Sequence, residues 1–357
     1  MPSTHIQLPS GHRIEKNGPV FIIAEAGVNH NGSMDLARQL IDVAASSGVD
    51  AVKFQTFQAE KLVTRNARQA SYQTENTGKS ESQFDMLKRL ELSFDHFREL
   101  KAYTEEKGLV FISTPFDEEA IDFLDSIEVE LFKAGSGDLT NIPYLKRMAA
   151  KGRPTIISTG MALPKEVEEA VSSILSQGLE DLVVLQCTSS YPCPPEAVNL
   201  RAMHELEELT ACLIGYSDHT AGILAPTAAA AMGATVIEKH FTLDRALPGP
   251  DHKASLEPEE LTEMVKQVRL VTTMRGDGKK RREPIEEDVA KVARKSVVTT
   301  RAIAAGVLIT PEMLTTMRPG TGLPPKYLDL LVGRTTSRHL EAHQPVIPED
   351  IRGDLSA

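Results

Sequence analysis

Two histidines stand where predicted neighbouring strands end, His219 in GYSDHT and His240 in IEKHF. Imidazole nitrogens bind divalent metals, and a metal with open positions can polarise a carbonyl group. Glu238 shares a strand face with His240, because side chains two residues apart on a strand point the same way. Asp251 follows in the loop PGPDHKAS. Together these residues suit a metal site and a structural role about equally, whereas a single histidine at a strand end is more often a structural hydrogen-bonding residue.

Two lysines lie on other predicted strands, Lys53 in VKFQT and Lys133 in FKAGSGD. Hydroxyls at Ser136 and Ser158 and the glycines of AGSGD and STG accompany them. Ammonium groups bind phosphate as point charges, and glycine backbones leave room for N–H contacts. The set predicts an anion site, ahead of a Schiff-base lysine or of lysines that merely pair with neighbouring carboxylates.

Two more strands, and the strand of Lys53, carry further polar residues at their ends. The first predicted strand offers Glu25, the second places Gln55 on the face of Lys53, and the third offers either Ser113 or Thr114. A metallo-hydrolase of the amidohydrolase kind would need a His-x-His pair in the first strand. Glu25 stands there instead, which disfavours that class.

Eight short apolar runs position these residues, each typical of a buried strand. They span residues 20–26, 51–56, 109–114, 131–134, 155–159, 182–187, 212–216 and 235–241. Segments with helical spacing of apolar residues lie between most of them. The order predicts an α/β (β/α)₈ TIM barrel, whose active site lies at the carboxyl ends of the strands. A doubly wound sheet is the alternative, but AEAGVNHNGS lacks a GxGxxG phosphate loop.

The chain is expected to divide at its charged connector. Residues 1–275 are predicted to form the barrel, 276–292 a linker and 293–357 a small β-domain. In that last segment TRAIAAGVLITPEML is repeated as SRHLEAHQPVIPEDI. The basic run KKRR in the linker is interpreted as a solvated connector.

Composition narrows the class of protein. The 357 residues are 41% hydrophobic and 25% charged, which is typical of a globular chain, and the net charge of −11 disfavours nucleic-acid binding. No apolar stretch approaches the roughly 20 residues of a membrane helix. The first 20 residues lack the apolar core of a signal peptide, so a cytoplasmic location is expected. Three cysteines without CxxC spacing suit reduced thiols.

The motifs resemble those of the sialic acid synthase family over about residues 18 to 352, in unbroken order. The matching segments are AEAGVNHNGS, VKFQTF, SYQTENTG, ISTPFD, FKAGSGD, ISTGM, CTSSYPCPPEAVNL, GYSDHT, EKHFTLD and GPDHKASLEP. The later run RAIAAGVLITPEMLTTMRPGTGL is similar to the family's C-terminal antifreeze-like (SAF) domain.

The resemblance implies condensation of phosphoenolpyruvate with an open-chain N-acetylmannosamine-type sugar, with release of phosphate by C–O cleavage. It implies that His219 and His240 hold Mn²⁺ or Mg²⁺, which activates the sugar aldehyde. The acceptor stays open among N-acetylmannosamine, its 6-phosphate and the diacetamido sugar that leads to legionaminate.

The resemblance also assigns roles to single residues. Those matching phosphoenolpyruvate contacts are Lys53, Lys133, Ser136, Ser158 and Tyr191, with Ser113 or Thr114 nearby. Those matching contacts to sugar hydroxyls or the reacting water are Glu25, Gln55, Asn76, Glu238 and Asp251. A domain-swapped homodimer is implied, in which Arg318 of MRPGTG reaches the partner's sugar. Some bacterial members have CTN or CNT before the Tyr-Pro pair, where this chain has Thr188, Ser189 and Ser190. An amide contact to substrate is thereby replaced by a hydroxyl, and Ser189 is counted among the substrate-binding residues.

Two further interpretations compete with the synthase. The chain could be a related phosphoenolpyruvate-dependent synthase or a metal-dependent pyruvate aldolase acting on another aldose. It could also be a binding protein whose tail contacts ice or polysaccharide. A binding protein with an inert barrel would be expected to have lost the polar site residues at the strand ends. All of these residues are present in the sequence.

Overall fold

The computed structural model describes residues 1–70, 73–74, 76 and 81–353. The chain divides into two compact units, Met1–Gly276 and Asp277–Ala357, which are described separately. No helix in the described part combines the length and apolar character needed to cross a bilayer.

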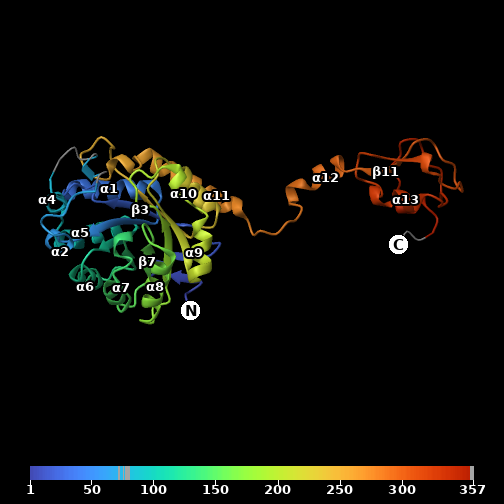
Figure 1. The fold of residues 1–357 in the computed structure, drawn as a ribbon. Coiled ribbons are helices and arrows are strands. Elements are labelled where there is room, and N and C mark those ends of the chain that lie inside the picture. The colour runs from blue at the N-terminus through green and yellow to red at the C-terminus, as the bar shows by residue number, and fades with distance from the viewer. Residues whose placement is uncertain (71–72, 75, 77–80, 354–357) are drawn as a thin grey trace. The chain divides into compact units, whose positions relative to one another are not determined.

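Eight parallel strands form the centre of the first unit (Figure 1). They are β3 (Phe21–Gly27), β4 (Ala51–Thr56), β5 (Val110–Pro115), β6 (Phe132–Ala134), β7 (Thr155–Ser158), β8 (Leu182–Cys187), β9 (Leu213–Asp218) and β10 (Val236–His240). Their order in the sheet is β5-β4-β3-β10-β9-β8-β7-β6. The first of these strands pairs with the last, and β5 and β6 at the two ends of this order also contact each other. The predicted TIM barrel is therefore confirmed, and the doubly wound alternative is wrong.

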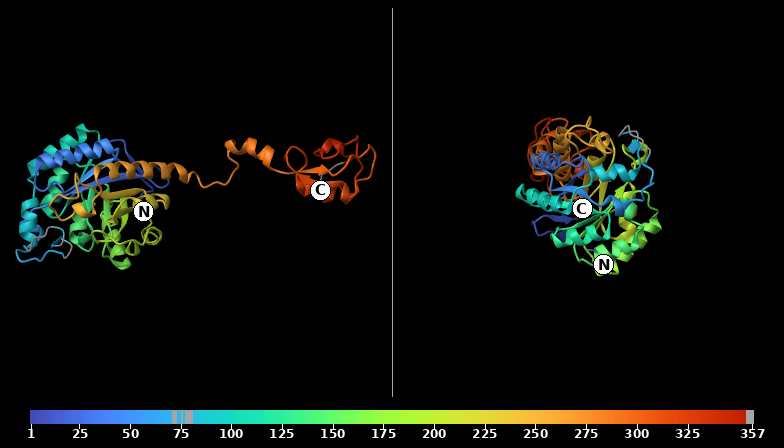
Figure 2. Two further views of the ribbon diagram at one scale, coloured as in Figure 1. Left: turned by 90° about the horizontal axis from the view of Figure 1, so that it is seen from above. Right: turned by 90° about the vertical axis from the view of Figure 1, so that its left-hand side faces the viewer.

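Helices lie outside the strands in the views of Figures 1 and 2. They are α1 (Met34–Ser47), α2 (Ala59–Leu62), α4 (Gln83–Leu90), α5 (Phe94–Glu106), α6 (Glu118–Ser126), α7 (Ile142–Ala149), α8 (Pro164–Leu175), α9 (Ala202–Thr210), α10 (Leu224–Ala231) and α11 (Pro258–Arg275). The apolar side chains that strands direct outward and helices direct inward form one large core. This shell of apolar contacts holds the strand ends, and thus the polar residues on them, in fixed places.

A short hairpin before the barrel was not predicted. Strands β1 (His5–Gln7) and β2 (Arg13–Glu15) pair antiparallel. Their apolar residues Ile6 and Ile14 join the cluster formed by inward-facing residues such as Ile23 and Val183. The hairpin thereby fills the end of the barrel at which the strands begin, and the polar site lies at the other end.

The second unit contains α12 (Glu287–Ala293), the antiparallel strands β11 (Ser296–Thr299) and β12 (Leu314–Met317), and α13 (Leu328–Leu331). The two copies of the repeat meet, since Ile303 and Leu340, which occupy equivalent positions in them, pair with each other. Both belong to the unit's own apolar core. The tail therefore folds around the two copies of its repeat.

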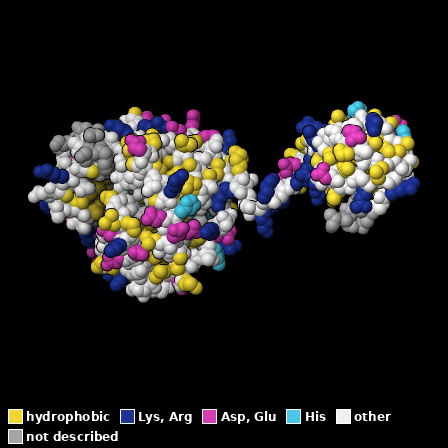
Figure 3. Space-filling view, turned by 45° about the vertical axis from the view of Figure 1, so that its right-hand side comes forward, with side chains coloured by type: hydrophobic (Ala, Val, Ile, Leu, Met, Phe, Trp, Pro, Cys, Tyr) yellow, Lys and Arg dark blue, Asp and Glu magenta, His cyan; other side chains and the backbone are white. Residues whose placement is uncertain are grey.

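Surface charges are mixed. On the face of the first unit seen in Figure 3, basic and acidic side chains are interspersed. The basic run of the connector is exposed, and Arg281 pairs with Asp277 and Glu283 while Arg282 pairs with Glu287. Neighbouring carboxylates thus balance part of the positive charge of that run.

Candidate functional site

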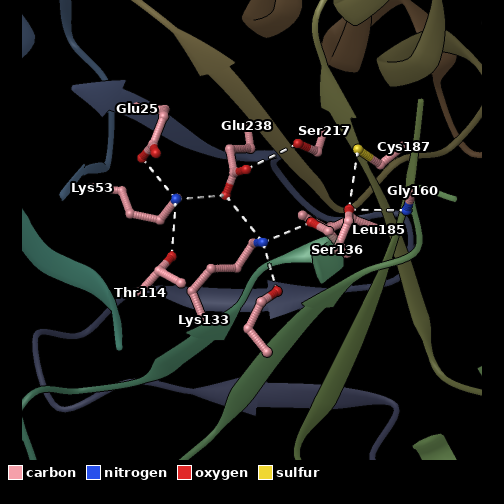
Figure 4. A network of polar contacts seen from close by, with 12 residues as sticks. Glu25, Lys53, Thr114, Lys133, Ser136, Gly160, Leu185, Cys187, Ser217 and Glu238 are labelled. Atoms are coloured by element: carbon pink, nitrogen blue, oxygen red, sulfur yellow. Dashed lines mark hydrogen bonds and ion pairs between the residues drawn. The ribbon is translucent and has the colours of Figure 1, made fainter. Parts of the chain in front are cut away.

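Inward-facing side chains at the carboxyl ends of the strands form one polar network (Figure 4). Glu25 on β3 stands beside Lys53 on β4, and the strand register places Glu25 beside His240 of β10. The side chain of Glu238 also points into this space. All four residues are at least nine-tenths buried. Charged groups collected this deeply in a barrel indicate a binding or catalytic site.

Four charges alternate in sign along this network. Lys53 Nζ lies 2.8 Å from Glu25 Oε2 and 3.8 Å from Glu238 Oε2, and Lys133 Nζ lies 3.8 Å from the same Glu238 oxygen. Thr114 Oγ1 accepts a hydrogen bond from Lys53 at 3.2 Å. Both lysines thus converge on one carboxylate oxygen at more than hydrogen-bond distance. Their ammonium groups retain donors for an anionic ligand.

Small residues surround Lys133. Its Nζ donates to Ser158 Oγ at 2.6 Å and to the Ala134 carbonyl at 2.9 Å. Nearby, the Gly160 N–H donates to Ser136 Oγ at 3.0 Å. A Cβ on Gly160 would lie 2.8 Å from Ser136 Oγ and would collide with Ser189 Oγ. A larger residue at this position would therefore displace the two serines, and Ser189 is placed beside the predicted anion site.

The two buried glutamates differ in protonation. Burial raises the pKa of Glu25 to about 7, although Lys53 opposes this shift. Burial also favours the neutral form of Glu238, but Lys133 and Lys53 outweigh it and lower the pKa of that carboxyl. The site therefore holds one carboxylate that stays ionised and one carboxyl that exchanges a proton near neutral pH.

A left-handed glycine fixes the approach of Glu25. Gly27 has φ +54° where the register between β3 and β4 shifts, and a Cβ there would lie 3.2 Å from Glu25 Oε1 and 3.3 Å from Gln55 Nε2. Gln55 Nε2 donates to Glu25 Oε1 at 3.1 Å. The bulge thus lets the backbone pass close to this hydrogen-bonded pair.

The two histidines lie together as predicted, with ring centroids 5.5 Å apart. Tyr191 packs against both rings, at 4.1 Å from His219 and 5.7 Å from His240. His219 Nδ1 donates to the Thr188 carbonyl at 2.8 Å, which leaves Nε2 for a ligand. Burial lowers the pKa of His240 well below its usual value, so this ring is neutral.

The residues fit a divalent metal. His240 Nδ1 is buried without a hydrogen-bond partner in the described part of the chain. A metal–nitrogen bond is about 2 Å long, so rings at this separation are close enough to share one ion. Among residues 1–70, 73–74, 76 and 81–353, no group of three or more His, Cys, Asp or Glu could hold a metal ion. His219 and His240 would therefore hold the ion together with oxygens from substrate or water.

A cavity of about 120 Å³ adjoins His240. Its polar lining includes Gln55, Tyr191 and Asp251, and its apolar side comes from α4 and neighbouring segments. Burial raises the pKa of Asp251 to about 6. Asn76 Nδ2 donates to the Pro250 carbonyl at 2.7 Å, which ties the segment after β4 to the loop that carries Asp251. A hollow of about 620 Å³ lies elsewhere, around Met203 and Cys212, and none of the predicted site residues lines it.

Two predicted residues are not brought into this network. Ser113 turns outward, where its hydroxyl lies 2.7 Å from Thr56 Oγ1, so Thr114 is the strand residue that faces Lys53. Arg318 is exposed in the second unit, away from that unit's own core. Part of the motif SYQTENTG, namely Ser71, Tyr72, Glu75, Thr77 and Gly78, lies outside the described residues.

Cys187 was not predicted to belong to the site. Its Sγ lies 3.6 Å from Ser136 Oγ and 3.8 Å from His219 Nδ1. Side chains alternate along β8, so Cys187 shares the inward face with Leu185, and this alternation is the sequence signal that points to Cys187.

Ser217 supports the neighbouring carboxylate. It donates a hydrogen bond to Glu238 Oε1 at 2.9 Å and thereby orients that group.

Comparisons with known proteins identify the family of this chain. Residues 40–280 match the NeuB family, and residues 294–352 match the SAF domain. The chain is 46% identical to the N,N'-diacetyllegionaminic acid synthase of Legionella pneumophila, over 93% of this chain and 94% of the relative. It is 40% identical to human N-acetylneuraminate-9-phosphate synthase, over 96% of each.

Among solved structures, the N-acetylneuraminic acid synthetase of Leptospira borgpetersenii, crystallised with citrate, superposes with a TM-score of 0.72 at 36% identity. The match covers 80% of this chain and 95% of that one.

Proposed function

The chain belongs to the NeuB family, and from that premise we propose that it condenses phosphoenolpyruvate with an open-chain N-acetylmannosamine-type sugar, forming a nonulosonic acid and phosphate. The observation that carries the proposal is the convergence of Lys53 and Lys133 on Glu238, 3.8 Å from each, directly beside the histidine pair. Such a site offers cations to an anionic donor and a metal to an aldehyde.

Phosphoenolpyruvate carries a carboxylate and a phosphate, which suits two separate ammonium groups. Lys133, Ser136, Ser158 and the Gly160 N–H offer polar contacts on one side of the network, and Lys53 with Thr114 offers them on the other. Ser189 beside Gly160 adds a hydroxyl on the first side. Burial strengthens each of these charge contacts, because little water competes for the anion.

A metal held by His219 and His240 would polarise the sugar aldehyde. The new bond forms between C3 of phosphoenolpyruvate and the aldehyde carbon, and the aldehyde oxygen takes a proton. Asp251 lies in the cavity with His240 and has a pKa of about 6, so it is a suitable donor of that proton.

Water then adds to C2 and gives up one proton to form a tetrahedral intermediate. Its new hydroxyl oxygen loses the second proton as it becomes the C2 ketone, the C–O bond to the phosphate breaks, and phosphate leaves with the bridging oxygen and takes up that proton. Glu25, with a pKa of about 7, is suited to accept the proton of this water, and Gln55 orients its carboxyl. Glu238 stays ionised between the lysines and keeps both of them charged while the donor is bound.

The acceptor is the open part of the proposal. N-acetylmannosamine gives N-acetylneuraminate, and its 6-phosphate gives the corresponding phosphorylated product. The 2,4-diacetamido-2,4,6-trideoxy sugar that leads to legionaminate is the second candidate. It is favoured by the apolar side of the cavity, where Met86, Leu87 and Leu90 of α4 would face a deoxy carbon.

The assembly completes the proposal. We propose a barrel domain at residues 1–275, a linker at 276–292 and an SAF domain at 293–357, arranged in a domain-swapped homodimer that works in the cytoplasm. Arg318 would reach the partner's sugar, which accounts for its exposure in its own unit. Covering the site in this way would exclude water from the reacting groups.

A phosphate-release assay tests the function. Phosphoenolpyruvate and Mn²⁺ are supplied with N-acetylmannosamine, its 6-phosphate or the diacetamido sugar, each in a separate reaction, and His219→Ala is the control. We expect release that requires one of the three sugars, the metal and His219. Absence of release with all three sugars would refute the proposal. If pyruvate, supplied in place of phosphoenolpyruvate, were consumed with the sugar at an equal rate, the protein would instead be an aldolase.

A further inference from the structure

A second buried ion pair lies on the outer side of the strands that carry the two histidines. Lys239 Nζ lies 2.5 Å from Asp218 Oδ2, and both side chains are fully buried. The two residues are also partners in the register between β9 and β10. Each is the immediate chain neighbour of one histidine, Asp218 of His219 and Lys239 of His240.

Apolar side chains of the core lie beside the pair. Tyr216 and Ile237, the outward-facing residues just before it on β9 and β10, belong to the core between barrel and helices, as does Phe241. Burying two charges costs free energy that their attraction often fails to recover, so apolar residues would serve packing at least as well. Packing alone therefore does not explain why charged residues stand here.

The contacts of the pair enclose the turn that carries His219. Asp218 Oδ1 accepts hydrogen bonds from Tyr216 Oη at 2.9 Å and from the Thr220 N–H at 3.1 Å. Asp218 Oδ2 accepts one from Thr220 Oγ1 at 3.0 Å, and Lys239 Nζ donates to the Thr220 carbonyl. The Asp218 carboxylate thus binds Tyr216, which precedes His219, and Thr220, which follows it. Lys239, on the strand of His240, bonds to both Asp218 and Thr220.

We infer that Asp218 and Lys239 are positioning residues that fix the separation and orientation of His219 and His240. The ion pair joins Asp218, the residue before His219, to Lys239, the residue before His240. These contacts set where the two rings stand. The expected effect of this ion pair on metal affinity rests on the function proposed above. Its effect on the positions of the two rings does not depend on that function.

The test compares folded variants of the full chain. Asp218→Asn combined with Lys239→Met removes both charges together, so that no unpaired charge is left buried. The matched control is Asp50→Asn with Arg269→Met, which removes the ion pair at 2.7 Å at the opposite ends of the strands. Thr220→Val is a milder variant, because it removes a single donor to Asp218. Crystal structures and Mn²⁺ titration of the metal-free proteins are the two measurements.

We expect the first double variant to show displaced histidine rings and a Mn²⁺ Kd raised about tenfold, within the range for residues that orient metal ligands. The control should retain both properties, and Thr220→Val should raise the Kd about threefold. Unmoved rings in the double variant, or an unchanged Kd with displaced rings, would overturn the inference. Should the double variant not fold, Thr220→Val decides by the same criteria.

Failure of the wild-type protein to bind Mn²⁺ would refute the metal in the proposed function. The ring positions alone would then decide the inference about Asp218 and Lys239.

Discussion

Replacing Lys133 with methionine should abolish most of the affinity for an anionic donor while leaving the fold intact. Lys133 Nζ lies 3.8 Å from Glu238 Oε2 in a fully buried site. Two unit charges about 4 Å apart attract each other by about 4 kcal/mol at an effective dielectric constant near 20. An anion that binds at a similar distance from Lys133 would lose an attraction of that order. Since 1.36 kcal/mol corresponds to a factor of ten, kcat/KM for phosphoenolpyruvate should fall about 10³-fold.

The thermal stability of Lys133→Met should change much less than its kcat/KM. The variant removes a buried ammonium whose desolvation is itself unfavourable, and Glu238 keeps Lys53 and Ser217 as partners. We therefore expect a Tm within a few degrees of the wild type.

Steady-state phosphate release at varied phosphoenolpyruvate concentration measures the effect, with Tm recorded in parallel. Lys151→Met is the matched control, because Lys151 is part-exposed and pairs with Asp122 at 2.7 Å on the helical surface. Its kcat/KM should equal that of the wild type. A loss of less than tenfold in folded Lys133→Met would show that this lysine does not face the donor and would refute the reasoning.

Three further outcomes are expected. Because burial raises the pKa of Glu25 from 4.5 to about 7, the folded chain keeps a proton that the unfolded chain has lost, so this carboxyl makes stability fall between about pH 4.5 and 7. Urea midpoints across that range should decline less in Glu25→Gln, and an equal decline would contradict the assignment. Gly160→Ala should raise KM for phosphoenolpyruvate at least tenfold, since the new methyl group meets Ser136 and Ser189; an unchanged KM in kinetic assays would place the donor elsewhere. Removing divalent metal with a chelator should abolish phosphate release, and added Mn²⁺ should restore it in the wild type but not in His240→Ala. Retained release after chelation, with metal content checked by atomic absorption, would remove the role of the histidine pair.

The barrel could be predicted because its strands are buried on both faces and therefore appear as short, nearly continuous apolar runs. Alternation within these runs placed Lys53, Glu238 and His240 on inward faces. The structure places Lys53 and Glu238 in the polar network of Figure 4 and His240 at the cavity beside it. The hairpin of β1 and β2 escaped prediction because each strand has three residues, too few for an alternating pattern to be recognised.

Other features depend on how strands are aligned, which a single sequence does not specify. The choice between Ser113 and Thr114 follows from which residue of β5 stands opposite Gln55, and that residue is Thr114. The pairing of Asp218 with Lys239 depends equally on the register of β9 and β10.

Phosphoenolpyruvate labelled with ¹⁸O at the bridging oxygen tests the central claim most directly. The enzyme is incubated with this donor, Mn²⁺ and the acceptor sugar that supports turnover, and the released phosphate is examined by ³¹P NMR. Condensation with C–O cleavage predicts that the label leaves in the phosphate and that release requires the sugar. Unlabelled phosphate, with the ¹⁸O retained on C2 of the organic product, would show P–O cleavage and contradict the account.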